Sequence, residues 1–484
     1  MSHGATTSGL PHWQLESIYP SLDSQQYLRD KERLQVAIDD LERYFTDNRV
    51  RADALASEPV LEAASGSKAV ILEGALDRLE ECSSLMATLQ PFVNLRIATD
   101  AFDERSQAEA SALKPHTTRL RALSARFKAW LGGLDIAELA SQTQRIKDHE
   151  YMLLRYKMES QHLLSDEGEE LAAALDETGG SSWAKLYTNL IARQTITAPV
   201  TTDSDQETGA PLAGEFVVAE LRALQSSRDR DVRRRAFEAE VALLRRNDVP
   251  FAAAMNGIKG QVEALAQRRG WSGAFEYSLF QHGITRASLD AMQSACAERF
   301  DDLRGYLLTK ARLLGTEKLA WYDLFAPLPQ TETPSYTWPE AKAFVVERFA
   351  TYSDRLATFA QRTFDEGWLD VPPRKGKRNG AFCSAIHPRG ESRVMLNFTG
   401  NAGDIRTLAH ELGHAYHNDC KVRSGRDVLQ VPTPMTLAET ASIFCETIVF
   451  QDQLQASSGP IRLALLEQDL QQVTQLVIDI HSRF

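Results

Sequence analysis

The chain has 484 residues, of which 43% are hydrophobic and 25% charged, and its 54 basic and 66 acidic side chains give a formal charge of −12. This length allows roughly three domain-sized units, and the composition excludes a disordered, collagen-like or membrane-embedded chain. The negative charge disfavours nucleic acid and anionic lipid surfaces as partners, because both carry charge of the same sign.

The sequence predicts long helices over residues 23–142, because apolar residues recur there at intervals of three and four. Residues 151–180 continue this pattern, and Ser165 before a run of acidic residues indicates a helix start and hence a helical hairpin. Residues 194–203 are rich in β-branched side chains and lead to turn formers, which predicts a short β-hairpin. We place a domain boundary there, between residues 195 and 196.

Helical periodicity resumes over residues 215–269 and 287–314. Residues 326–339 are rich in proline and predict a loop. A basic, glycine-bearing run at 374–380 precedes a strand candidate at 392–398, which indicates a small sheet beside the helices. The expected fold class is therefore mostly α.

The cysteines form a scattered set without a closely spaced pair, namely Cys82, Cys296, Cys383, Cys420 and Cys445. Such a set fits neither a disulfide framework nor a cysteine-only zinc site, and it favours a reducing compartment. The first nine residues lack the basic and apolar parts of a secretory signal, and no run of eighteen apolar residues occurs. We therefore expect a cytoplasmic protein without a membrane partner.

The sharpest chemical signal is the string HELGHAYH at residues 410–417. Apolar residues around it recur at helical spacing, and Asp404 is a candidate N-cap, so a helix is predicted. Histidines one turn apart share a helix face, which places His410 and His414 to hold one tetrahedral zinc ion. Glu411 is then placed to reach a water on that ion. By chance this pattern would occur in about one or two of a hundred such chains. In such a chain the histidines would be hydrogen-bonded core residues and would not bind a metal.

A catalytic zinc site needs a third protein ligand. The extended motif of the metzincins is excluded, because the positions it requires hold His417 and Cys420 here. A carboxylate from a separate helix is the other route, and Glu439 supplies one, although with Thr436 it also fits a helix capping box. Glu446, seven residues later, is either an alternative ligand or a hydrogen-bond acceptor for a ligand histidine. The residues alone do not rank the two glutamates.

The string at 410–417, followed by TLAETAS at 436–442, resembles the signature of the oligoendopeptidase F group within the thimet-oligopeptidase-like zinc peptidases of the gluzincin type. Further likeness lies in WQLESIYP at 13–20, LAWYDL at 319–324 and GKRNGAFC at 376–383. The resemblance implies a zinc ion held by His410, His414 and Glu439. It also implies that Glu411 is the catalytic acid and base.

The same resemblance implies a nearly all-helical, two-lobed fold with a deep channel for short peptides and a small β-sheet beside the active-site helix. Residues 1–195 would form the N-terminal helical lobe and residues 196–484 the zinc catalytic domain. Family members usually continue past the position of Phe484 with a tyrosine-rich segment, so we expect that a C-terminal segment is missing. The chain is thus expected to be a zinc endopeptidase of oligopeptides or, alternatively, an inactive zinc-binding scaffold that needs that segment or a partner chain.

Recognition of varied peptides is expected to rely mostly on the peptide backbone. The strand at 394–398 is predicted to bind an extended peptide edge to edge. The basic run at 374–380 is either a solvated loop or a holder of a substrate carboxylate. His417 stands roughly 10.5 Å along the helix axis from His410, which argues against joint ligation. It either contacts substrate or ligand groups, or serves only in packing.

Overall fold

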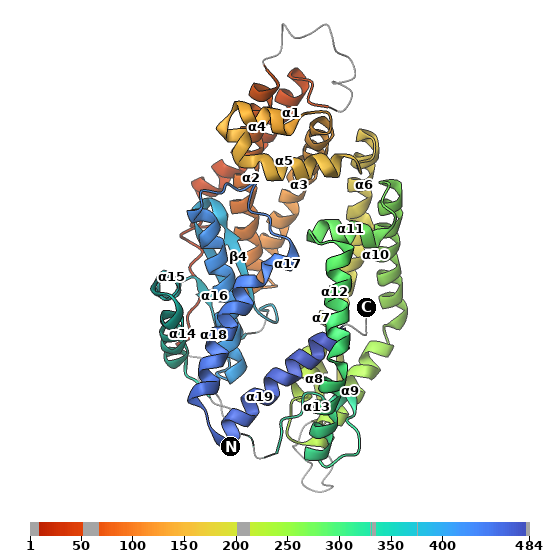
Figure 1. Cartoon of the computed structure of the whole chain (residues 1–484), viewed down its shortest axis with the longest axis vertical. Helices are drawn as coiled ribbons and strands as arrows, with labels where there is room; N and C mark the ends of the chain where they lie inside the picture. The colour runs from red at the N-terminus through yellow and green to blue at the C-terminus, as the bar shows by residue number, and fades with distance from the viewer. Residues whose placement is uncertain are drawn as a thin grey trace. The chain divides into compact units, whose positions relative to one another are not determined.

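The computed structural model describes residues 9–51, 67–200, 213–329, 331, 335–374 and 376–480. Two compact units are present, the first made of Met1–Leu175, Ala266–Ser272 and Tyr336–Phe450, the second of Asp176–Leu265, Gly273–Ser335 and Gln451–Phe484. Helices dominate both units, as predicted (Figure 1). The boundary predicted between residues 195 and 196 stays a prediction, and each unit draws segments from both sides of it.

Some segments named in the sequence analysis lie outside the described residues. They are the predicted turn within residues 201–212, Lys375 of the basic run, and the chain ends at 1–8 and 481–484. Within the described part, no helix combines the length and the apolar character needed to cross a lipid bilayer.

The N-terminal part of the first unit consists of α1 (Gln25–Asp47), α2 (Lys68–Thr99), α3 (Glu104–Leu131), α4 (Ile136–Gln142) and α5 (Gln144–Ser160). These helices pack on one another around an apolar core that includes Leu34, Phe92 and Phe127. Ser24 caps α1 and Asp103 caps α3 by accepting hydrogen bonds from backbone N–H groups of the first turn. The long helices predicted over residues 23–142 are confirmed in the described parts of that range, 23–51 and 67–142.

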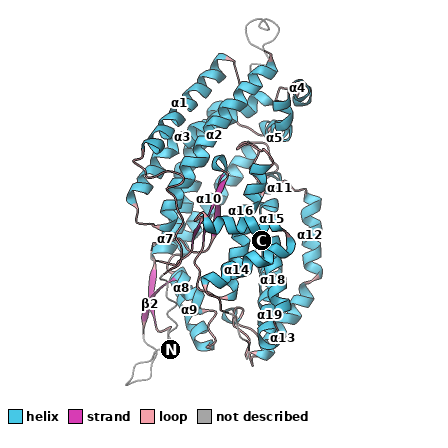
Figure 2. Ribbon diagram, turned by 90° about the vertical axis from the view of Figure 1, so that its left-hand side faces the viewer, coloured by secondary structure: helices cyan, strands magenta, loops and turns pink. Residues whose placement is uncertain are grey.

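The following helices are α6 (Asp166–Thr178) and α7 (Gly180–Arg193), and the predicted cap Ser165 accepts a hydrogen bond from the N–H of Gly168. Strands β1 (Thr195–Ala198) and β2 (Gly214–Val217) pair antiparallel (Figure 2), which confirms a strand within residues 194–203. The partner strand lies at 214–217, where the sequence predicted a helix from residue 215. The second unit continues through α8 (Val218–Leu224), α9 (Arg230–Arg245), α10 (Asp248–Arg268), α11 (Ala274–His282), α12 (Arg286–Glu298), α13 (Phe300–Leu313) and α19 (Gly459–Thr474).

Charged groups are buried inside this second unit together with their partners. Arg230 and Arg233 both hydrogen-bond the fully buried carboxylate of Asp323. The buried ammonium of Lys310 lies 2.6 Å from Oε1 of Glu467, which joins α13 to α19. Each buried charge therefore has an oppositely charged partner, as a low-dielectric interior requires.

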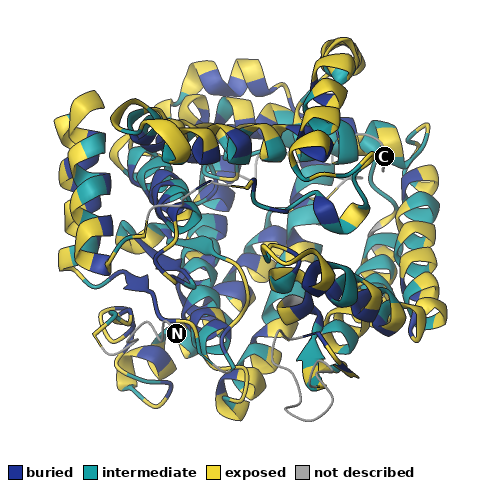
Figure 3. Cartoon of the chain, turned by 90° about the horizontal axis from the view of Figure 1, so that it is seen from below, coloured by how far each residue is buried: buried dark blue, intermediate teal, exposed yellow. Residues whose placement is uncertain are grey.

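The remaining elements of the first unit are α14 (Trp338–Tyr352), α15 (Asp354–Asp365), β3 (Leu369–Asp370), β4 (Phe382–Ile386), β5 (Glu391–Met395), α16 (Ala402–Arg423), α17 (Met435–Ala438) and α18 (Thr440–Ala456). The sheet order is β3-β5-β4, with β5 parallel to β3 and antiparallel to β4. Helix α16 packs against β4 and β5 and contributes Ile405, Leu408 and Leu412 to a buried core. Most helices carry buried residues along one side only (Figure 3). The small sheet predicted beside the helix that carries residues 410–417 is therefore confirmed.

Two details of the sheet differ from the sequence prediction. Strand β5 ends at Met395, and both of its edges are paired up to that residue, so a peptide cannot add beside Val394 and Met395 as predicted. The basic loop is also not a carboxylate holder at Lys377, whose buried ammonium donates to the carbonyls of Asp370, Pro372 and Leu396. Lys377 therefore closes the end of the sheet.

Helix α16 passes close to the start of α18 at Gly413. A Cβ atom on this residue would lie 2.6 Å from Cα of Ser442 and 2.7 Å from the carbonyl oxygen of Ala441. Both are backbone atoms that cannot rotate away, so any side chain would push the two helices apart.

We expect Gly413→Ala to destabilise the protein by about 1–3 kcal/mol, because the added methyl group overpacks the contact. Urea unfolding followed by circular dichroism measures the change. The matched control is Gly260→Ala in α10, where nothing lies within 4 Å of the added Cβ. This control is expected to be neutral or to stabilise by about 0.4–1 kcal/mol. Equal stability of the two variants would contradict the close contact.

Candidate metal centre

The start of α16 is fixed by a reciprocal cap. The side chain of Asn401 accepts a hydrogen bond from the N–H of Asp404, and the Asp404 carboxylate accepts from the N–H groups of Asn401 and Gly400. The N-cap is therefore Asn401 and not the predicted Asp404, which lies in the first turn and reaches back. This cap sets where the helix begins and hence which residues face the sheet.

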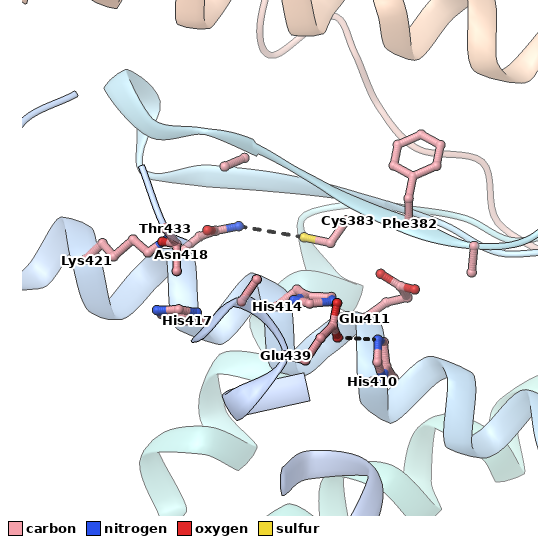
Figure 4. A pocket seen from close by; sticks show the side chains of 13 residues that line it. Phe382, Cys383, His410, Glu411, His414, His417, Asn418, Lys421, Thr433 and Glu439 are labelled. Carbon is pink, nitrogen blue, oxygen red and sulfur yellow. Dashed lines mark hydrogen bonds and ion pairs between the residues drawn. The ribbon is translucent and has the colours of Figure 1, made fainter. Parts of the chain in front are cut away.

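The structure brings together the three side chains that the sequence singled out as ligands. Oε2 of Glu439 lies 3.2 Å from Nε2 of His410 and 3.3 Å from Nε2 of His414. The two histidines come from α16, whereas Glu439 follows the last residue of α17. Figure 4 shows the carboxylate turned toward both imidazoles.

This spacing can be tested against the geometry of a metal site. Two ligand atoms at about 2.0–2.1 Å from one tetrahedral zinc ion lie about 3.3 Å apart. The two measured distances from Glu439 match that value, and the ligand atoms of all three residues lie within 4.8 Å of one another. Two imidazole nitrogens and one carboxylate oxygen are also the donor types that zinc prefers. The residues therefore fit a zinc ion.

Contacts behind the cluster hold these side chains in place. Oε2 of Glu446 lies 3.3 Å from Nδ1 of His410, and Arg406 donates to Oε1 of the same carboxylate. The hydrogen bond to Glu446 raises the pKa of His410. Because Glu446 occupies the Nδ1 side of the ring, Nε2 stays turned toward Glu439, which favours the acceptor alternative for Glu446.

Glu439 is oriented by Ser442, whose hydroxyl donates to Oε2 at 2.7 Å. The capping-box interpretation of Glu439 is wrong, since the N-cap of α17 is Pro434 and the carboxylate points to the histidines. His414 also hydrogen-bonds the backbone of Ala438, the residue before Glu439. The turn between α17 and α18 is thus tied to α16 at several points.

Glu411 follows the first histidine and is only 6% exposed. Burial raises the pKa of its carboxyl to about 7; His410 opposes this shift and Glu439 adds to it. A carboxyl group poised near neutrality both accepts and releases a proton readily, as general acid and base catalysis requires.

A cavity of about 410 Å³ lies over this cluster. Strand β4 contributes Phe382 and Cys383 to its wall, and α16 contributes His417 and Lys421 beyond the ligand histidines. Residues 410, 414, 417 and 421 follow helical spacing and line this one cavity. From the sequence, His417 is either a substrate or ligand contact or a packing residue, and Lys421 is not singled out, although the same helical spacing places it on the ligand face.

Comparison with known proteins places most of the chain within peptidase family patterns. The pattern described as Peptidase family M3 matches residues 223–476, more than half of the chain. A second pattern, described as Oligopeptidase F, matches residues 133–195.

Oligopeptidase PepF of Bacillus subtilis is 24% identical over 57% of this chain and 40% of its own length. An oligoendopeptidase F homolog of Lactococcus lactis is 24% identical over 70% of this chain and 54% of its own length. The crystal structure of oligoendopeptidase-F from Enterococcus faecium superimposes with a TM-score of 0.62 at 17% identity, covering 93% of this chain and 73% of that one. The chain spans about half the length of the curated relatives that it matches, and the extent of the first pattern shows that it belongs to peptidase family M3.

Proposed function

We propose that this chain is a zinc-dependent endopeptidase that hydrolyses short oligopeptides. The observation that carries the proposal is the spacing of Glu439 from the Nε2 atoms of His410 and His414, which matches a tetrahedral zinc site. Membership of a peptidase family and the names of the matched relatives support peptides as the substrate class. The five free thiols fit the cytoplasmic location that we also propose.

His410, His414 and Glu439 would hold the zinc ion. Bound zinc would supply a Lewis acid that polarises the scissile carbonyl and the attacking water. Glu411 lines the same cavity, so its carboxylate accepts the proton of the attacking water. The protonated carboxyl then donates to the leaving amine nitrogen, which the raised pKa of about 7 favours.

The peptide itself is proposed to lie along β4. This strand is at the edge of its sheet, because among the described strands it pairs only with β5. Phe382, Cys383 and Ala385 of β4 line the cavity opposite α16. Main-chain hydrogen bonds to such an edge bind a peptide with little regard to its side chains, which suits an enzyme that trims varied sequences.

We expect Glu411→Gln to lower kcat for an internally quenched fluorescent peptide by about 10²- to 10⁴-fold, because the amide cannot accept the proton. The zinc content of the purified variant is expected to equal that of the wild type, since Glu411 is not among the proposed ligands. A chelator added to the wild type is the matched control and should abolish hydrolysis. Undiminished hydrolysis by the variant would refute the role of Glu411.

The same experiment separates the two functions considered from the sequence. Zinc bound by the wild type with no cleavage of any peptide would favour the inactive scaffold that needs a further segment or partner chain. Chelator-sensitive cleavage by the chain alone would exclude that alternative.

We expect Glu446→Gln to weaken zinc binding by about 10- to 100-fold, because the charged acceptor that orients His410 and makes it a stronger donor to the metal is lost. Competition with a chromophoric chelator measures the dissociation constant. Glu347→Gln removes an equal charge from the exposed surface of α14 and should bind zinc like the wild type. An unchanged dissociation constant in Glu446→Gln would show that the contact to His410 does not tune the metal site.

A further inference from the structure

The cavity over the metal centre has a basic end that the proposed reaction does not use. His417 and Lys421 lie on α16 about one and two turns beyond His414 and line the cavity with the neighbouring Asn418. Figure 4 shows the Lys421 side chain beside Asn418 and Thr433, at the end away from His410. The carboxylates that line the cavity, Glu411 and Glu439, belong to the metal end.

No described residue offers Lys421 a counter-charge. Its ammonium makes no hydrogen bond or ion pair with the described part of the chain, and burial lowers its pKa. Burial also raises the pKa of the facing Cys383 thiol to about 12, so the thiol is neutral. The Asn418 amide is turned toward Cys383 Sγ and Ser392 Oγ. A partly desolvated cation without a partner is costly, and an anionic ligand at this end would offset that cost.

Helix geometry gives the separation of Lys421 from the ligand histidines along α16. Lys421 follows His414 by seven residues, a rise of roughly 10.5 Å along the helix. An extended peptide advances about 3.3 Å per residue. For a peptide that runs along α16, this rise therefore corresponds to about three residues of substrate. Helical side chains lean toward the N-terminus, which brings the ammonium of Lys421 nearer to the metal end.

We propose that Lys421 is a specificity-determining residue that binds a carboxylate of the peptide two or three residues from the bond that is cut. This inference rests on the proposed endopeptidase function and adds to it a preferred substrate class, peptides with an anionic group at that distance. The carboxylate comes either from an acidic side chain or from the C-terminus of the peptide, since both present the same group to the ammonium.

The test uses matched quenched peptides that differ only in charge. One carries glutamine and a C-terminal amide, a second series places glutamate at each position in turn, and a third has a free C-terminal carboxylate. The readout is the ratio of kcat/KM for each anionic peptide to that for the neutral one. We expect a ratio of about 10 to 100 in the zinc-loaded wild type for one of these positions. The position that gives it identifies the source of the carboxylate.

In Lys421→Met this ratio is expected to fall close to one, and in Lys421→Arg to stay above one, because arginine keeps the charge. Lys114→Met removes the same charge from an exposed position on α3 and is expected to keep the wild-type ratio. A wild-type ratio near one at every position, or an unchanged ratio in Lys421→Met, would overturn the proposal. The first of these outcomes needs no variant, so the test holds even if Lys421→Met folds poorly.

A binding arm separates this inference from the proposed function. Fluorescence anisotropy with zinc-loaded Glu411→Gln measures the dissociation constants of the neutral and anionic peptides without turnover. Tighter binding of the anionic peptide, lost when Lys421→Met is added, supports the inference even if the wild type cleaves nothing. Equal binding of both peptides by an enzyme that does cleave them would overturn the inference and leave the proposed function standing.

Discussion

The candidate site depends on the close contact between α16 and the start of α18 at Gly413. Because Gly413 has no side chain, the backbone of Ala441 and Ser442 packs directly against the backbone of α16. Ser442 in turn holds Glu439, and Ala438 holds His414. The two imidazoles and the carboxylate meet only because these backbones are this close.

Charge alternates along the line of contacts at the centre. Arg406 pairs with Glu446, which contacts one nitrogen of His410, while the other nitrogen faces Glu439. Each buried or half-buried group thus lies next to one of opposite or complementary character, which limits the cost of removing them from water. Glu411 is outside this line, and its raised pKa reflects burial without a cationic partner of equal strength.

Much of this could be predicted from the sequence, because the information was local. Helical periodicity gave the helices, and the spacing of His410 and His414 gave a shared face. Glu439 and Glu446 could not be ranked, since an interval of seven assumes one continuous helix, whereas the chain breaks between α17 and α18 at Glu439. The sequence also pointed to the basic run that contains Lys377 as a carboxylate holder and did not single out Lys421. Only the tertiary fold shows that the first is buried among carbonyl groups and that the second lines the cavity.

The unequal charge of the two cavity ends bears on how a peptide approaches. The chain as a whole is strongly negative, so acidic peptides are repelled at long range, and the basic end of α16 is a local exception. If peptides bind along β4 as proposed, the cation of Lys421 would attract the carboxylate of an approaching peptide before any main-chain pairing occurs. The choice between the two opposite directions in which a peptide can align along this sheet edge would then depend on where the peptide carries its charge, and not on side-chain fit alone.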